Sequence, residues 1–174
     1  GSQSWLPAAL QAAEPAESGS AGKIACPTKS LSHMDNQMRP ALVTGASGFL
    51  GWHVARVLLE RGYRVRALVR PGSRVDALDV ESVTGDLRDP ASLKRAVAGC
   101  GLLFHVAADY RLWAKDPTEL YRSNVDGTRN VLTMMKELAI PKGVYTSTLT
   151  VFSDTRGQMV DESYMYTGTS FLSE

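Results

Sequence analysis

The chain has 174 residues, of which 44% are hydrophobic and 21% charged, and its formal net charge at pH 7 is +1. This balance is normal for a globular protein and gives no reason to expect a nucleic-acid surface. No apolar run approaches the roughly 20 residues of a membrane helix, nothing is typical of a signal peptide, and two cysteines cannot build a disulfide framework. We therefore expect a cytoplasmic protein without nucleic-acid or membrane partners.

The first part of the chain differs from the rest. Residues 1–37 are rich in Ala, Ser, Gly and Pro and show no sustained helical or strand period. Their first two residues, Gly-Ser, are typical of a scar left by tag cleavage. We expect 1–37 to be a disordered tag or leader, although a short helix around Trp5 to Glu14 is an alternative. An ordered pattern begins at Met38, so 38–174 is the predicted folded domain.

Strand-like and helix-like segments alternate from there on. Strands are expected at 41–44, 64–69, 80–84, 101–107 and 144–148, and helices at 49–61, 90–98 and 117–138. Two Asp-Pro pairs, at Asp89 and Asp116, are typical N-caps followed by proline at the first helical position. The alternation predicts an α/β fold, a Rossmann-like parallel sheet with helices on both faces.

A glycine-rich turn joins the first strand to the first helix. Gly45 permits a tight turn, Gly48 lets a pyrophosphate approach the backbone, and Gly51 lets the helix pack closely on the sheet. The helix N-terminus offers unpaired N–H groups and a positive dipole end to a phosphate. The predicted dinucleotide contacts are Gly45, Ser47, Gly48, Phe49, Leu50 and Gly51. A structural turn without a ligand is the alternative.

Five motifs in order carry a family resemblance. They are the glycine turn with its Gly-x-x-Gly-x-x-Gly spacing, Gly-Asp-Leu at 85–87, His-Val-Ala-Ala at 105–108, Asn-Val-Asp-Gly-Thr at 124–128, and Tyr-Thr-Ser-Thr at 145–148. Together they resemble the extended short-chain dehydrogenase/reductase superfamily, of the NAD-dependent epimerase/dehydratase type. Within it, the chain is most similar to dihydroflavonol-reductase-like proteins and hopanoid-associated sugar epimerases.

The resemblance implies roles for residues at two strand ends. It implies that Asp86 contacts the adenine, that Leu87 beside it binds the cofactor, and that a segment after the fourth strand lines the cofactor. The residues of that segment are His105, Ala107 and Ala108. Histidine at a strand end suggests a general base, but the resemblance favours cofactor lining for His105.

The end of the second strand bears on the choice of nicotinamide cofactor. An NAD-preferring site usually has Asp or Glu there, whereas this chain has Arg70, followed by Arg74 in the next turn. Arginine can pair with a 2′-phosphate through two hydrogen bonds, so NADP is favoured and NAD is the alternative. Arg70 could instead be a solvated strand end, with Arg64 and Arg66 on its face. The histidines and cysteines lack metal-like spacing, so no metal is expected.

Catalytic groups are expected at two places. Asn124 falls on the apolar face of helix 117–138, where an amide without partners would cost about 1–3 kcal/mol; it marks a site or a polar core bridge. By resemblance, this Asn bonds a main-chain carbonyl and holds water for a proton relay. The resemblance also implies that Thr148, with Ser147 second, orients the substrate oxygen.

The family's proton-transfer pair, Tyr-x-x-x-Lys, has no match here, because no tyrosine is followed by lysine four residues later. We expect a fragment truncated after about the fifth strand, without the catalytic helix or the substrate domain, and inactive alone. The parent would reduce a ketone or oxidise a secondary alcohol with NADP(H). Alternatives are an NAD-dependent sugar-nucleotide epimerase/dehydratase and a non-catalytic dinucleotide sensor. The resemblance implies a homo-oligomer, because members of the family commonly dimerise through the fourth and fifth helices. Without the fifth helix, we expect the exposed apolar residues of helix 117–138, such as Leu132 and Met134, to pair abnormally, and truncation leaves a sheet edge open to association.

Overall fold

The computed structural model describes residues 39–111, 113–148, 151–152, 155 and 157–164. The chain divides into two compact units, Gly1–Val144 and Tyr145–Glu174. The predicted leader, 1–37, lies outside the described residues. None of the helices among the described residues is long and apolar enough to cross a membrane.

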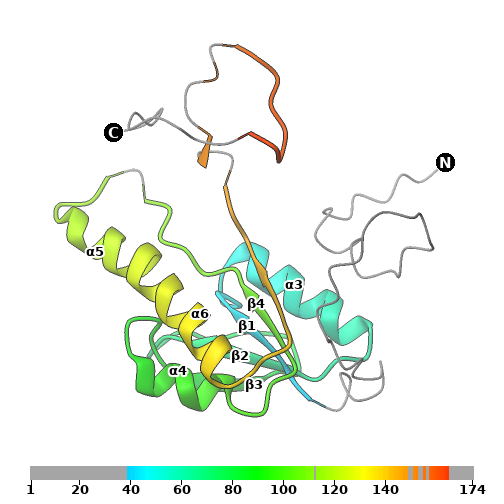
Figure 1. The fold of residues 1–174 in the computed structure, drawn as a ribbon. Helices are drawn as coiled ribbons and strands as arrows, with labels where there is room; N and C mark the ends of the chain where they lie inside the picture. The colour runs from blue at the N-terminus through cyan, green and yellow to red at the C-terminus, as the bar shows by residue number, and fades with distance from the viewer. Residues whose placement is uncertain (1–38, 112, 149–150, 153–154, 156, 165–174) are drawn as a thin grey trace, which may run out of the picture. The chain divides into compact units, whose positions relative to one another are not determined.

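The first unit is built on a five-stranded sheet with the order β3-β2-β1-β4-β5 (Figure 1). Its strands are β1 (Ala41–Thr44), β2 (Val65–Val69), β3 (Glu81–Thr84), β4 (Leu102–His105) and β5 (Lys142–Tyr145). β1 pairs in parallel with both β2 and β4, and β2 pairs in parallel with β3. The chain therefore builds outward from β1 to β3 and then returns to the other side of β1. In open parallel sheets, ligands bind outside the strand ends at such a reversal.

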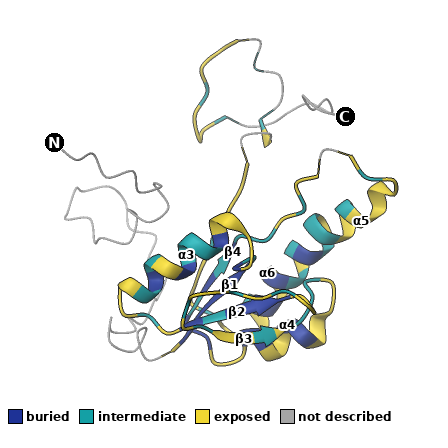
Figure 2. Cartoon of the chain, turned by 180° about the vertical axis from the view of Figure 1, so that it is seen from behind, coloured by how far each residue is buried: buried dark blue, intermediate teal, exposed yellow. Residues whose placement is uncertain are grey.

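Helices cover both faces of the sheet, as predicted. α3 (Phe49–Glu60) packs against one face, while α4 (Pro90–Val97) and α6 (Gly127–Glu137) pack against the other. Successive residues of β1 point to opposite faces of the sheet. Leu42 packs in the hydrophobic cluster with α4 and α6, and Val43 packs in the cluster with α3. Figure 2 shows the buried residues gathered in the central strands and on the inward sides of the helices.

Local signals explain where the helices begin and end. The Asp89 carboxylate accepts a hydrogen bond from the Ala91 N–H at 3.0 Å, and the Asp116 carboxylate accepts one from the Thr118 N–H at 2.9 Å. Both predicted N-caps are thus confirmed. Gly62, just after α3, has a φ of +80°, a backbone conformation that favours glycine.

The predicted helix 117–138 is present from Pro117 to Glu137, but one of its turns is π-helical. The segment consists of α5 (Pro117–Tyr121), a π-helical turn η1 (Arg122–Asp126) and α6. The start of α6 lies close to the loop between β3 and α4. A Cβ added at Gly127 would lie only 3.0 Å from the Leu87 Cβ, so a glycine suits this close approach. π turns of this kind occur often at functional sites, and this one contains Asn124.

Three other expectations need correction. Met134 is 7% exposed, because it continues the buried face of α6 seven residues after Gly127, whereas Leu132 is 52% exposed as predicted. The fifth strand lies at 142–145 rather than 144–148. Arg66 is not a solvated residue: its guanidinium donates hydrogen bonds to the Ala96 and Ala98 carbonyl oxygens at 2.9 and 2.7 Å. It therefore places a cation on the C-terminal end of α4, where the helix dipole is negative.

Candidate functional site

The turn between β1 and α3 is shaped by two glycines. Gly45 has a φ of +76°, and a Cβ there would lie 2.8 Å from the Cα of Ala107, so the turn lies against the segment that follows β4. A Cβ at Gly51 would collide with the Gly45 carbonyl oxygen. Gly51 therefore brings the helix close to the turn itself, which refines the expected contact with the sheet.

The third glycine has a different setting. Gly48 is the N-cap of α3, no side chain caps this helix end, and its N–H bonds the Gly45 oxygen at 2.9 Å. A Cβ at Gly48 would lie 3.4 Å from the Gly45 oxygen, close to ordinary van der Waals contact, so packing within the described protein does not demand a glycine. The neighbouring Ser47, Phe49 and Leu50 are exposed. An open, uncapped helix N-terminus of this kind fits a phosphate group.

A second feature lies at the end of β2. Residues 70–73 form a type II turn: Pro71 is its second residue, Gly72 has a φ of +80°, and the Ser73 N–H bonds the Arg70 oxygen at 2.9 Å. Arg70 and Arg74 are exposed on either side of this turn. No described residue forms a hydrogen bond or salt bridge with either guanidinium group, so both can reach a ligand.

Two aspartates, one after β3 and one after β4, are held ionised by arginines. Arg88 donates hydrogen bonds to the Asp86 carboxylate at 2.7 to 2.9 Å and lowers its pKa. Arg111 does the same for the pKa of Asp109. The charge of Arg70 lowers the pKa of both carboxyls further. The ends of β2, β3 and β4 therefore share one electrostatic environment.

Leu87, which is also predicted to bind the cofactor, has a side chain that belongs to the core. That side chain packs against the core under α4 and α6, and its carbonyl accepts a hydrogen bond from the Asn130 amide at 3.0 Å. The sequence pattern places Leu87 in the correct loop but does not reveal that its side chain belongs to the core.

His105 lies inside the fold, with 2% of its surface exposed. Its Nδ1 is 2.8 Å from the Thr44 Oγ1, and its Nε2 is 2.9 Å from the Thr128 Oγ1. Burial lowers the pKa of His105 to about 4. The imidazole is therefore neutral at pH 7 and connects β1, β4 and α6. The two alanines expected beside it differ: Ala107 is half-buried and Ala108 is exposed.

Asn124 forms two hydrogen bonds with the backbone of one residue in the loop after β4. Its Nδ2 donates to the Asp109 carbonyl oxygen and its Oδ1 accepts from the Asp109 N–H, both at 2.7 Å. The expected bond from this Asn to a main-chain carbonyl is thus present, and a second bond completes it. Sequence reasoning did not single out Thr44 for its hydroxyl; a threonine ending an otherwise apolar strand was the available signal.

The predicted substrate-orienting hydroxyls belong to the second unit. Ser147 and Thr148 are exposed and follow β5, and the Thr148 carbonyl accepts a hydrogen bond from the Val151 N–H at 3.3 Å. The residues that the structure brings together at the ends of β1 to β4 all belong to the first unit.

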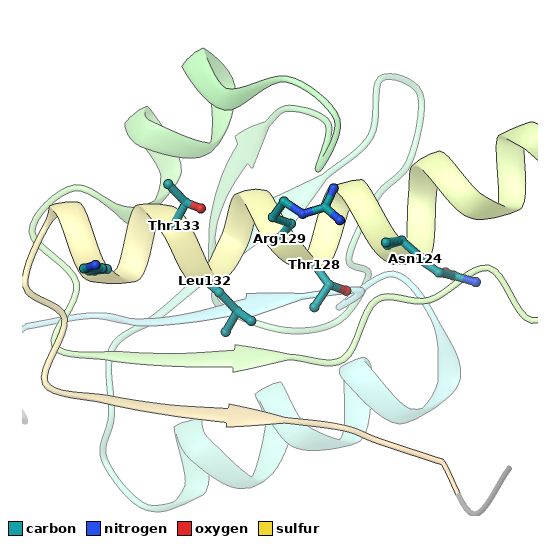
Figure 3. A pocket seen from close by; sticks show the side chains of 7 residues that line it. Asn124, Thr128, Arg129, Leu132 and Thr133 are labelled. Carbon is teal, nitrogen blue, oxygen red and sulfur yellow. The ribbon is translucent and has the colours of Figure 1, made fainter. Parts of the chain in front are cut away.

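An open groove of about 600 Å³ runs along η1 and α6 (Figure 3). It is lined by Asn124, Val125, Thr128, Arg129, Leu132, Thr133 and Lys136. It contains no residue of the glycine turn. Two of its lining residues contact the end of β4 and the loop after it: Thr128 bonds His105 and Asn124 bonds the Asp109 backbone. The described residues contain no group of three or more side chains suited to holding a metal ion.

Comparison with known proteins gives a consistent result. A family described as "NAD dependent epimerase/dehydratase family" matches residues 41–170. The "Putative dihydroflavonol 4-reductase" of Synechocystis sp. is 50% identical over 70% of the chain and 36% of the relative. A 4-hydroxy-2-methyl-3-oxo-4-farnesyl-3,4-dihydroquinoline-1-oxide ketoreductase of Stigmatella aurantiaca is 41% identical over 70% of the chain and 37% of the relative.

Solved structures agree on the fold. The UDP-glucose 4-epimerase of Bifidobacterium longum, in complex with NAD⁺ and UDP, is 27% identical with a TM-score of 0.65, over 76% of this chain and 44% of that one. The chain thus spans little more than a third of the length of the two curated relatives and less than half of this structure.

Proposed function

The chain belongs to the NAD dependent epimerase/dehydratase family, and from this premise we propose that it is the NADP(H)-binding part of an oxidoreductase. The parent protein would reduce a ketone or oxidise a secondary alcohol by hydride transfer. Family membership makes the chain a nicotinamide-dinucleotide domain of the oxidoreductase and epimerase type. The choice of NADP, the ketone or alcohol substrate and the roles of single residues are the proposal.

The observation that carries the proposal is the arginine pair at the end of β2. Arg70 and Arg74 flank a type II turn at the edge where parallel sheets bind ligands. A guanidinium group pairs well with a phosphate, and neither guanidinium group is engaged by a described residue. An acidic residue at the Arg70 position, which would hold a ribose hydroxyl and repel a 2′-phosphate, is absent.

The other residues have the following proposed roles. The N–H groups after Gly48 hold the diphosphate, and the exposed Phe49 and Leu50 border it. Asp86, ionised by Arg88, accepts hydrogen bonds from the adenine. Asn124 fixes the loop after β4 through both atoms of its amide.

Chemistry on the substrate needs further groups. A bound nicotinamide supplies the hydride donor or acceptor. Thr148, or Ser147, orients the substrate oxygen by a hydrogen bond. Since no tyrosine of the chain precedes a lysine by four residues, these residues offer no matched proton donor. We therefore expect no turnover from this chain by itself.

A binding titration tests the proposal. Purified chain is titrated with NADPH and NADH by calorimetry, alongside Arg70→Ala, Arg74→Ala and a control, Arg61→Ala, at the exposed C-cap of α3. NADPH should bind more tightly, and each of the first two variants should lose about tenfold in NADPH affinity with little change for NADH. Equal affinities of the unsubstituted chain for NADPH and NADH would contradict the NADP assignment. So would variants that lose the same affinity for both cofactors.

The second candidate is an NAD-dependent sugar-nucleotide epimerase. The similarity to the UDP-glucose 4-epimerase structure favours it, and so does the proximity of Arg70 to two carboxylates that offset its charge. This candidate predicts tighter NADH binding, NAD that co-purifies with the chain, and no cofactor effect of Arg70→Ala.

We also propose that the protein forms a homo-oligomer. Leu132 is 52% exposed and lies in the groove along α6, where an apolar contact would remove it from water. Light scattering should show a mass above that of the monomer, and Leu132→Ser should lower it. A monomeric parent chain at all concentrations would contradict this.

A further inference from the structure

An indole hydrogen bond links α3, the helix after the glycine turn, to the loop after β2. The Nε1 of Trp52 donates to the carbonyl oxygen of Asp76 at 3.0 Å, across 24 positions of the sequence. The backbone N–H of Trp52 donates to the Gly48 carbonyl oxygen at 2.9 Å. One residue is thus bonded to the glycine turn through its backbone and to the arginine-bearing loop through its side chain.

The indole is held in a defined orientation. The Arg56 guanidinium lies 5.6 Å from the ring centroid, and the His53 ring meets it edge to face at 5.0 Å. Arg56 in turn pairs with Glu60 at 3.5 Å. A cation over the ring face and an aromatic edge against it both favour one rotamer of the tryptophan.

The loop needs such a restraint at this position. Ala77, directly after Asp76, has a φ of +59°, which a non-glycine residue adopts only at a cost of about 1 kcal/mol or more. Val75 and Leu78 pack against the core cluster of α3 on either side. The hydrogen bond from Trp52 satisfies the carbonyl at the strained point and so holds the loop in this conformation.

The two arginines depend on this loop to different degrees. Arg70 directly follows Val69, a buried residue of β2, so the sheet places it. Arg74 lies beyond the turn, two residues before Asp76, so its position depends on how the loop is held. A change at Trp52 would therefore move Arg74 more than Arg70.

We propose that Trp52 is a positioning residue for cofactor selectivity: by holding the Asp76 carbonyl it places Arg74 beside Arg70, where the pair takes the 2′-phosphate of NADP. The inference rests on the proposed function. Trp52 itself does not touch the phosphate, and its effect passes through the loop.

The test uses Trp52→Phe, which keeps an aromatic ring and removes the N–H donor. NADPH affinity should fall about fivefold, while NADH affinity changes less than about twofold. Trp113→Phe, at an exposed tryptophan in the loop after β4, is the matched control and should change neither. In an Arg74→Ala background, Trp52→Phe should have no further effect on NADPH, because the group that it positions is gone.

Equal losses for both cofactors, or an undiminished NADPH loss in the Arg74→Ala background, would overturn the inference. Amide hydrogen exchange of residues 71–79 gives a readout that needs no cofactor: Trp52→Phe should speed exchange there and leave residues 85–92 unchanged. Unchanged exchange in 71–79 overturns the positioning role whichever cofactor the chain prefers. If the unsubstituted chain prefers NADH and loop exchange is faster in Trp52→Phe, the NADP assignment is overturned, while the role of Trp52 in holding the loop stands.

Discussion

Thr44 and His105 are joined by a 2.8 Å hydrogen bond whose direction can be deduced. The Thr44 Oγ1 already accepts hydrogen bonds from the N–H groups of Val106 and Ala107, at 3.1 and 3.2 Å. Its two lone pairs are therefore used, and its hydroxyl proton must go to the His105 Nδ1. The imidazole then carries its proton on Nε2 and donates it to the Thr128 hydroxyl. A proton added at Nδ1 would break the hydrogen bond from the Thr44 hydroxyl and would face an oxygen that already accepts two hydrogen bonds.

The first prediction is a loss of stability below pH 6.5. The pKa of His105 is about 4 in the folded chain against 6.5 as an ordinary histidine, so the unfolded chain binds the proton first as the pH falls. The stabilisation is complete above pH 6.5 and is lost toward pH 4, amounting to on the order of 3 kcal/mol. Urea unfolding at pH 7.0, 5.5 and 4.5 measures it.

Substitutions test whether this pH dependence arises from His105. His105→Gln should lower the free energy of unfolding at pH 7 and flatten its slope between pH 6.5 and 4. Asn130→Ala, which removes a hydrogen bond to the Leu87 carbonyl but no ionisable group, should leave the slope unchanged. A slope that persists in His105→Gln would contradict the assignment.

The second prediction separates two glycines of one turn. In Gly51→Ala the new Cβ meets the backbone oxygen of Gly45, which cannot move aside, so the chain should lose at least about 2 kcal/mol of stability. Gly48→Ala meets no such obstacle and should remain within about 1 kcal/mol of the parent, yet bind dinucleotides more weakly. Thermal melts measure the stability of both variants, and the calorimetric titration measures their cofactor affinity. Undiminished cofactor binding by a folded Gly48→Ala variant would contradict the phosphate role of this turn.

The third prediction concerns the Asn124 clamp. Asn124→Ala removes both bonds to the Asp109 backbone and should cost about 1–3 kcal/mol. Asn124→Asp keeps an acceptor for the Asp109 N–H but presents a carboxylate to its carbonyl, so it should be no more stable than the alanine variant. Asn130→Ala, which loses one bond to the Leu87 carbonyl, should cost less than Asn124→Ala in the same denaturation experiment.

The fourth prediction concerns the cation under α4. Arg66→Met keeps the apolar stem but removes the donors to Ala96 and Ala98, and should cost about 1–3 kcal/mol. Glu81→Gln removes only the ion pair with Arg66, in which the glutamate side chain is 48% exposed, and should cost less than about 1 kcal/mol. Equal losses in chemical denaturation would show that the ion pair, rather than the helix cap, is what stabilises the chain.

The sequence by itself determined the features that depend on neighbours in the chain. Strand and helix alternation, the two Asp-Pro caps and the glycine turn could all be predicted, because backbone geometry and local hydrogen bonds decide them over a few residues. The family resemblance likewise depended on motif order, and the match over residues 41–170 agrees with it.

Only the tertiary structure decided which distant groups meet. It placed Arg66 at the C-terminal end of α4, buried Met134 on the inward face of α6, and joined Trp52 to Asp76. None of these contacts has a local pattern, because side chains 20 or more positions apart are brought together by packing around one sheet. The same reason holds for His105: its place at a strand end could be predicted, whereas its neutral state follows from burial between two threonines.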